Sequence, residues 1–150
     1  TKLMFDFKNS KILDLFSGSG SFGLECISRG SVNVTFVEKN PVALKNLHKN
    51  IKKLKVEKIS NVFQDDVFHL LKNRNFLKKN TNLIYLDPPF KEEKILEIFK
   101  CLIQQNNFSS KILIVLHRNK GDDIPFNSYQ CIEKKKYGNS KILFGNILSL

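Results

Sequence analysis

Along most of this chain, short apolar runs alternate with segments whose apolar residues recur every three or four positions. The apolar runs indicate buried strands over residues 11–16, 33–37, 59–63, 82–86 and 112–116. The segments between them have helical spacing, and in one of them Leu44, Leu47, Ile51 and Leu54 form a single apolar face. Because strands that alternate with helices build parallel sheets, this pattern predicts an α/β fold.

The last part of the chain departs from this alternation. Residues 129–137 and 141–144 have the composition of two strands, and Gly138 and Asn139 between them favour a hairpin turn. A strand that enters through a short hairpin runs antiparallel to its neighbour. The sequence therefore predicts a doubly wound, mostly parallel, seven-stranded Rossmann-like sheet with one antiparallel strand near the C-terminus. Residues 1–150 are long enough for one domain.

A short motif, Asp87-Pro88-Pro89-Phe90, directly follows the apolar run 82–86. Both prolines fix φ and lack an N–H, so the chain leaves the sheet in a rigid turn with few backbone hydrogen bonds. Such a turn presents a carboxylate, backbone carbonyls and an aromatic ring. These groups suit a planar substrate with an NH2 group, whose hydrogens the oxygens accept and whose face the ring covers. The alternative is an ordinary strand-to-helix turn with a core Phe.

A glycine-rich turn follows the first predicted strand. Residues 17–23 read Ser-Gly-Ser-Gly-Ser-Phe-Gly, and a helix is predicted over 22–29, closed by Gly30. A strand, a glycine turn and a helix in this order are typical of nucleotide sites. Glu38 ends the second strand, where an acid can bind ribose hydroxyls. Asn40 and Pro41 then predict the N-cap and first residue of the next helix.

The spacing of Gly18, Gly20 and Gly23 also fits the G-x-G-x-x-G motif of dinucleotide oxidoreductases. However, Asp14 stands four residues before the first glycine, where an acid has no obvious use beside a pyrophosphate. It would suit a ligand with an ammonium group, such as the methionine end of S-adenosylmethionine. A hydride-transfer enzyme also has no need of the Asp87 turn. These two features favour a methyltransferase over a dehydrogenase.

Several acids and a histidine lie at or just past the ends of predicted strands: Asp14, Glu38, Asp66, Asp87 and His117. Doubly wound sheets bind ligands outside the carboxyl ends of their strands, near the point where the strand order reverses. This convergence predicts one active cleft.

The formal net charge is +11 and the pI is about 9.6, which favours a polyanionic partner. Nearly all of this charge is lysine, so the signal is weaker than an arginine-rich surface would give.

The sequence has no long apolar run and no signal-peptide pattern. Its three cysteines, Cys26, Cys101 and Cys131, lie in apolar-periodic segments and are predicted to be reduced core thiols of a cytoplasmic protein.

With these motifs, the chain resembles the RsmD-type methyltransferases. These enzymes use S-adenosylmethionine to modify the guanine 2-amino group of bacterial small-subunit (16S) ribosomal RNA. The resemblance is carried by residues 14–30, 37–40, 86–90 and 136–138, and thus spans nearly the whole chain. The Asp-Pro-Pro-Phe motif alone is shared with DNA adenine and cytosine amino-methyltransferases and with protein-glutamine ones, which are the alternatives. The run from Gly23 to Gly30 is more discriminating.

The resemblance implies a role for each motif residue. The catalytic turn comprises Asp87, Pro88, Pro89 and Phe90: Asp87 and the Pro88 carbonyl would hold the amine, and Phe90 would stack on the base. The cofactor site comprises Asp14, Phe16, Gly18, Gly20, Glu38, Lys39, Asp66, Val67 and Asp87. Within it, Asp14 would lie near the methionine amine and Glu38 would bind the ribose. Asp66 would bind the adenine amine, with Asp65 as its alternative. No metal is required.

The implied partner is small-subunit ribosomal RNA, within an assembling subunit. The protein is expected to be a cytoplasmic monomer that does not bind a membrane. One departure from the family concerns the N-terminus. Family members usually carry a basic segment and a helix containing Arg-Glu-x-x-Phe-Asn before the first strand, whereas residues 1–6 here resemble only the end of that helix. This keeps open a non-catalytic RNA-binding module with a methyltransferase fold.

Overall fold

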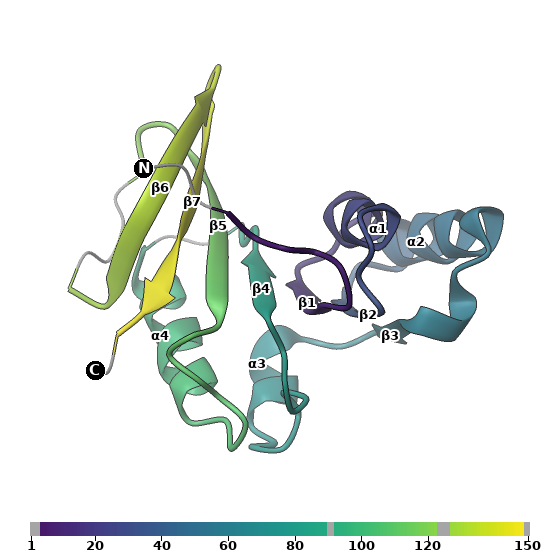
Figure 1. Cartoon of the computed structure of the whole chain (residues 1–150), viewed down its shortest axis with the longest axis horizontal. Helices are drawn as coiled ribbons and strands as arrows, with labels where there is room; N and C mark the ends of the chain where they lie inside the picture. The colour runs from purple at the N-terminus through teal and green to yellow at the C-terminus, as the bar shows by residue number, and fades with distance from the viewer. Residues whose placement is uncertain (1–3, 90–91, 123–126, 149–150) are drawn as a thin grey trace.

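The computed structural model describes residues 4–89, 92–122 and 127–148, and one sheet runs through all of this part of the chain (Figure 1). The elements are β1 (Lys11–Leu15), α1 (Ser21–Ser28), β2 (Asn33–Val37), α2 (Pro41–Leu54), η1 (Glu57–Ile59), β3 (Ser60–Phe63), α3 (Val67–Leu71), β4 (Leu83–Leu86), α4 (Glu92–Ile103), β5 (Leu113–Asn119), β6 (Tyr129–Tyr137) and β7 (Ser140–Ile147).

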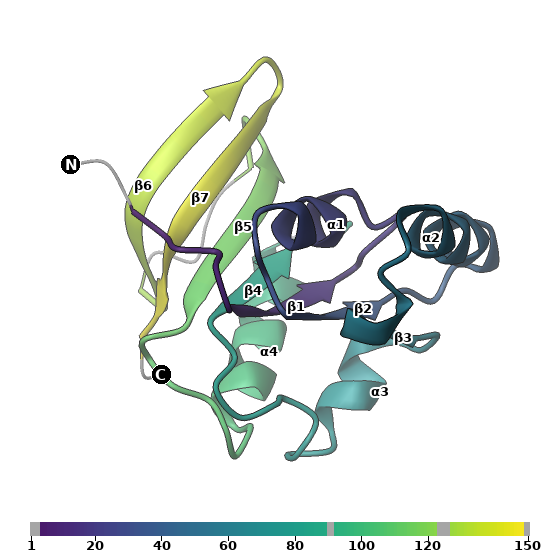
Figure 2. The ribbon, with the colours of Figure 1, turned by 45° about the vertical axis from the view of Figure 1, so that its right-hand side comes forward.

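The strand order is β3-β2-β1-β4-β5-β7-β6. The first five strands pair in parallel, and β7 runs antiparallel to both β5 and β6. The predicted fold, with its single antiparallel strand, is confirmed. Helices α1 and α2 cover one face of the sheet, and α3 and α4 cover the other (Figure 2). The winding reverses between β1 and β4, where such sheets bind ligands.

Each face of the sheet carries its own apolar core. Along β1, Ile12 packs on the face covered by α1 and α2, whereas Leu13 and Leu15 pack on the opposite face. This is the two-residue period of a strand. The α2 face was predicted correctly for its first three leucine and isoleucine positions, but Leu54 is 55% exposed. Its position is exposed because α2 ends there, and Lys55 turns into the left-handed region.

The predicted start of α2 is confirmed. The side chain of Asn40 accepts hydrogen bonds from Val42 N at 2.9 Å and Ala43 N at 3.1 Å, and Pro41 is the first helical residue. Gly30 follows α1 with φ of +110°, the conformation expected of a residue that closes a helix.

Two strands are longer than their apolar runs predicted. Strand β5 continues through three polar residues to Asn119, and β7 extends from Ser140 to Ile147. The end of β5 pairs with the start of β7, with Asn119 opposite Ser140, and the end of β7 pairs with β6, with Ile147 opposite Tyr129.

The prediction for the cysteines is partly wrong. All three are free, and Cys26 is buried, but Cys101 is half-buried and Cys131 is exposed. Cys131 lies on β6, the edge strand of the sheet, where most side chains are exposed. No helix in the described ranges has both the length and the apolar content to cross a membrane.

Candidate active site

The loop after β1 is held by hydrogen bonds to β1 and β2. The Ser17 hydroxyl donates to the Asp14 carbonyl at 2.7 Å and accepts from Val37 N at 3.1 Å. Gly18 N donates to Glu38 Oε1 at 2.7 Å. Phe16, at the start of the loop, has φ of +61°, which is rare for a bulky residue. The loop therefore has a defined shape, and an unusual backbone conformation lies at its first residue.

Glycine is needed at the three positions of the motif for different local reasons. Gly18 has φ of +57° and nothing within 4 Å of where a Cβ would stand, so the space above it is open. At Gly20 a Cβ would lie 2.4 Å from a Leu47 methyl, and at Gly23 it would lie 2.4 Å from the Phe36 ring. Gly18 thus leaves room for a ligand, whereas Gly20 and Gly23 allow α1 and its loop to pack closely on β2 and α2.

Asp14 lies beneath this loop and is completely buried. Its Oδ2 accepts a hydrogen bond from Gly23 N, in the first turn of α1, at 3.2 Å. Its Oδ1 has no hydrogen-bond partner among the described residues. Burial, with a smaller contribution from the nearby charges of Asp87 and Glu38, raises the pKa of Asp14 to about 8, although the hydrogen bond from Gly23 N lowers it in part.

A cavity of about 260 Å³ lies at the carboxyl edge of β1 and β2. Its walls are formed by Phe16, Gly18, Val37, Glu38, Lys39, Asp65, Asp66, Val67, Asp87 and Pro89. Four of the chain's 14 acidic residues line it, although the protein as a whole is strongly basic. Its apolar walls suit a flat ring, and its carboxylates suit hydroxyl, amine and ammonium donors. A dinucleotide pyrophosphate does not fit this wall, because the amide of Gly18 is already bonded to Glu38.

Both aspartates after β3 line this cavity. Asp66 is the N-cap of α3: its Oδ1 accepts from Phe68 N at 2.9 Å and His69 N at 3.2 Å. Its Oδ2 lies 3.7 Å from Lys39 Nζ. Asp65 accepts from His69 Nδ1 at 2.9 Å, and this hydrogen bond lowers the pKa of Asp65. The predicted adenine position and its alternative are therefore neighbours in one wall.

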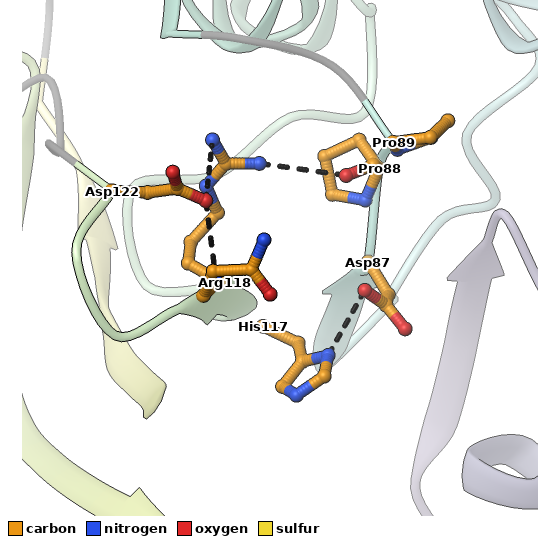
Figure 3. Close-up of a pocket in the computed structure, with 7 residues that line it drawn as sticks. Asp87, Pro88, Pro89, His117, Arg118 and Asp122 are labelled. Atoms are coloured by element: carbon orange, nitrogen blue, oxygen red, sulfur yellow. Dashed lines mark hydrogen bonds and ion pairs between the residues drawn. The ribbon is translucent and has the colours of Figure 1, made fainter. Parts of the chain in front are cut away.

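A second cavity, of about 230 Å³, lies beside the first (Figure 3). It is lined by Asp87, Pro88, Pro89, His117, Arg118, Asn119 and Asp122. Asp87 and Pro89 belong to the walls of both cavities. The rigid turn after β4 thus forms a partition with one cavity on each side.

The side chains of Asp87 and His117 contact each other at the carboxyl edge of the sheet, where the turn after β4 begins. Leu86 of β4 lies opposite Leu116 of β5, so the next residue of each parallel strand reaches the same level at the carboxyl edge. His117 Nδ1 lies 2.9 Å from Asp87 Oδ1. In Figure 3 the other carboxylate oxygen of Asp87 points away from the imidazole. That oxygen remains available to a ligand.

The Pro88 carbonyl also has a partner. Arg118, whose side chain is buried, donates from Nη1 to Pro88 O at 3.4 Å, and its Nη2 lies 3.4 Å from Asp122 Oδ2. A carbonyl oxygen has two lone pairs, so this long hydrogen bond leaves one acceptor position. Arg118 thereby links the turn after β4 to the loop after β5.

The structure brings most of the predicted site residues together. Asp14, which is buried beneath the loop, and Gly20, which packs against Leu47, are the exceptions, because neither lines the cavity. Phe90 lies outside the described residues. The sequence pattern puts His117 at a strand end but assigns it no role, and it points to none for Arg118, Asn119 or Asp122. The signal that could have found them is their position directly after the buried run 112–116.

The strand order and the acid-lined cavity at its carboxyl edge define a Rossmann-like methyltransferase fold. The same fold occurs in an RNA methyltransferase from Salinibacter ruber, solved in complex with S-adenosyl-L-homocysteine, with a TM-score of 0.68 and 17% identity over 95% of this chain and 84% of that one. The chain belongs to the family described as conserved hypothetical protein 95, which matches residues 2–146.

Relatives with higher sequence identity support this family assignment. Ribosomal RNA small subunit methyltransferase D of Buchnera aphidicola is 30% identical over 88% of this chain and 68% of its own length. A conserved hypothetical protein of Streptococcus pyogenes has a structure with a TM-score of 0.80 and 28% identity over 93% of this chain and 87% of that one. The predicted resemblance to RsmD-type methyltransferases is confirmed. The relatives are longer, and the chain spans 65% of the length of one from Bacillus subtilis.

Proposed function

We propose that this protein transfers the methyl group of S-adenosylmethionine to the 2-amino group of a guanine in small-subunit ribosomal RNA. The observation that carries the proposal is the pair of cavities separated by Asp87 and Pro89. One cavity suits a cofactor with ring, ribose and ammonium groups. The other has room beside the same carboxylate for the amine of a base. The relatives named as ribosomal RNA methyltransferases support the choice of substrate.

The cofactor would be held by the acid-lined cavity. Phe16, Val37 and Val67 would pack against the adenine ring, and the carboxylate of Asp66, or of Asp65, would accept its amine hydrogens. Glu38 would bind the ribose hydroxyls, with Lys39 beside it at the rim. Gly18 gives the ligand close access to the backbone. Asp14, which does not line this cavity, is assigned to the methionine amine from the sequence motif alone.

When bound, S-adenosylmethionine supplies an electrophilic methyl group on a sulfonium. The amine of a base is a poor nucleophile because its lone pair is delocalised into the ring. The free carboxylate oxygen of Asp87 and the remaining lone pair of the Pro88 carbonyl would accept the two amine hydrogens. This favours a pyramidal nitrogen whose lone pair faces the first cavity. Positioning of this kind supplies most of the rate in such reactions.

Methyl transfer forms one bond and breaks one bond. The amine nitrogen forms a bond to the methyl carbon, and the carbon–sulfur bond breaks with its electron pair going to sulfur. One amine proton leaves through the carboxylate of Asp87 to solvent. His117 holds the other carboxylate oxygen 2.9 Å away and so fixes the rotamer of Asp87. Phe90 is assigned the stacking role from the sequence motif alone.

The base must be out of any RNA helix before it can reach this site. A single sheet with short loops offers little surface with which to read a DNA sequence in the major groove. We therefore favour a loop of ribosomal RNA in a partly assembled small subunit, acted on by a monomer in the cytoplasm.

The test supplies methyl-labelled cofactor with three substrates: duplex DNA, naked small-subunit RNA, and small subunits from cells lacking this gene. Label is expected at a guanine 2-amino group of the RNA. Label in DNA, or at another RNA base, would overturn the substrate while leaving a methyltransferase. If no substrate acquires label although the protein binds the cofactor, the non-catalytic alternative holds instead.

A further inference from the structure

Three basic residues form a row across the last three strands of the sheet. Arg118 of β5 lies opposite Lys141 of β7, and Lys141 lies opposite Lys136 of β6. Residues paired in register share a face of the sheet. In the same strands Leu116 is paired with Leu143, and both belong to the core under α4. The row therefore lies on the same face of the sheet as this apolar core, and nearer to the carboxyl edge of the parallel strands.

Like charges directly opposite each other on neighbouring strands repel each other. Arg118 and Lys141 are only 7% and 8% exposed, so water and salt screen them less than surface charges. Asp122 contacts both cations: its carboxylate pairs with Arg118, and its carbonyl accepts a hydrogen bond from Lys141 Nζ.

One end of the row, at Arg118, lies at the second cavity. Arg118 and Asp122 line that cavity. Lys120 N donates to Asn139 O at 2.7 Å, which joins the loop after β5 to the turn of the β6–β7 hairpin. The side chains of Lys120 and Lys136 are exposed. The tip of this hairpin projects beyond the other strands (Figure 1).

We propose that the basic rim formed by Arg118, Lys120, Lys136 and Lys141 binds the phosphates of single-stranded RNA on either side of the target nucleotide. The proposal rests on the proposed function, because it places the target base in the cavity beside Asp87. A base turned out of its strand leaves its own phosphate at the cavity mouth, where the rim begins.

Within the rim, the exposed and buried cations have different tasks. Lys120 and Lys136 contact phosphates as mobile point charges. Arg118 and Lys141 hold the loop after β5 in place and add to the positive potential from below. Such a surface follows the RNA backbone without reading its sequence.

The test compares two double variants that remove the same charge. In the rim variant, Lys120→Gln and Lys136→Gln are combined. In the control, Lys45→Gln and Lys49→Gln are combined on the exposed face of α2, which lies at the far end of the molecule from the hairpin (Figure 1). All four side chains are exposed, so both variants should melt like the wild type.

The readout is binding of a labelled single-stranded RNA oligonucleotide over a series of salt concentrations, without cofactor. Each lost phosphate contact lowers the slope of log affinity against log salt by about 0.7, so the rim variant should lose about 1.4 and the control almost nothing. In methyl transfer, the rim variant should show a KM for RNA raised about tenfold, an order-of-magnitude expectation, with kcat near wild type.

Equal slopes of log affinity against log salt for the two double variants would contradict the proposed RNA-binding role of the rim, even if the protein proves to be a methyltransferase. Loss of slope confined to the rim variant supports it, even if no methyl transfer is found, so the two proposals can fail separately. If the rim lysines instead control binding to anionic lipid vesicles, and the wild type prefers vesicles or duplex DNA to single-stranded RNA, the rim is not an RNA site.

Discussion

The carboxylate of Glu38 holds the backbone of Gly18: Oε1 accepts the Gly18 amide hydrogen at 2.7 Å, and Oε2 accepts that of Asn40 at 2.9 Å. One acid at the tip of β2 thus ties the loop after β1 to the start of α2. The orientation of this carboxylate is set before any ligand arrives, which lowers the entropic cost of binding.

Replacing Glu38 by alanine should weaken S-adenosylmethionine binding by roughly 1–3 kcal/mol, since ribose hydroxyls and a loop amide lose their acceptor. Calorimetric titration measures the effect directly. Glu57→Ala, which removes an exposed acid from η1, is the matched control and should bind as the wild type does. Wild-type affinity in Glu38→Ala would remove Glu38 from the cofactor site.

The second prediction concerns the turn after β4. Asp87→Ala should leave cofactor affinity nearly intact and lower turnover at least about a hundredfold, as the loss of a positioned polar group does. Single-turnover methyl transfer with saturating cofactor is the measurement. Turnover within a few-fold of wild type would show that Asp87 does not hold the amine.

His117 should act through Asp87. Because it fixes one carboxylate oxygen, His117→Ala should lower kcat about tenfold, on the order of a lost orienting hydrogen bond, and leave cofactor affinity unchanged. The decisive readout is the double variant: in an Asp87→Ala background, His117→Ala should cost almost nothing more. Additive losses would show that His117 acts independently, and partial recovery in His117→Asn would support a hydrogen-bonding role.

Substitutions at Gly18 and Gly20 should separate cofactor binding from folding. Gly18→Ala places a methyl in open space at positive φ, so it should cost about 1 kcal/mol of stability and interfere mainly with the cofactor. Gly20→Ala adds a clash with Leu47 and should lower stability by about 2–4 kcal/mol. Chemical denaturation and cofactor titration on both variants check this. Equal stability losses would contradict the assignment.

The buried Asp14 predicts a pH dependence of stability. Its pKa is raised from 3.8 to about 8, so between these values the folded protein keeps a proton that the unfolded chain releases. The unfolding free energy should therefore fall as pH rises through this window and level off above it. Urea unfolding at about pH 5 and about pH 8 should show a larger fall for wild type than for Asp14→Asn. Parallel behaviour of the two proteins would contradict the buried, protonated carboxyl.

Much of the fold could be predicted because the chain signals it locally. The apolar runs and helical spacing specify the order of strands and helices, and Asn40-Pro41 and Gly30 mark where helices begin and end. The polar end of β5 could not be predicted this way. His117 follows an apolar run and has no strand signal of its own, and it belongs to β5 because β7 pairs with it.

The site was predictable at the level of motifs and less so at the level of individual roles. Both Gly18 and Gly20 satisfy the same motif, and only the position of Leu47 shows that one leaves room for a ligand and the other for packing. Asp14 illustrates the same difficulty: its spacing suggested a ligand contact, whereas its depth and its bond to Gly23 depend on how α1 sits on the sheet.

The division of the sheet by the turn after β4 has a consequence for how specificity can change in this family. Apart from the turn itself, the first cavity is built from the end of β2, the loops after β1, β2 and β3 and the start of α3, and the second from the end of β5 and its loop. Variation in residues 117–122 can therefore alter which amine is presented without disturbing the cofactor. The turn itself serves both sides at once, so it should be the segment that tolerates the least change as substrates diverge.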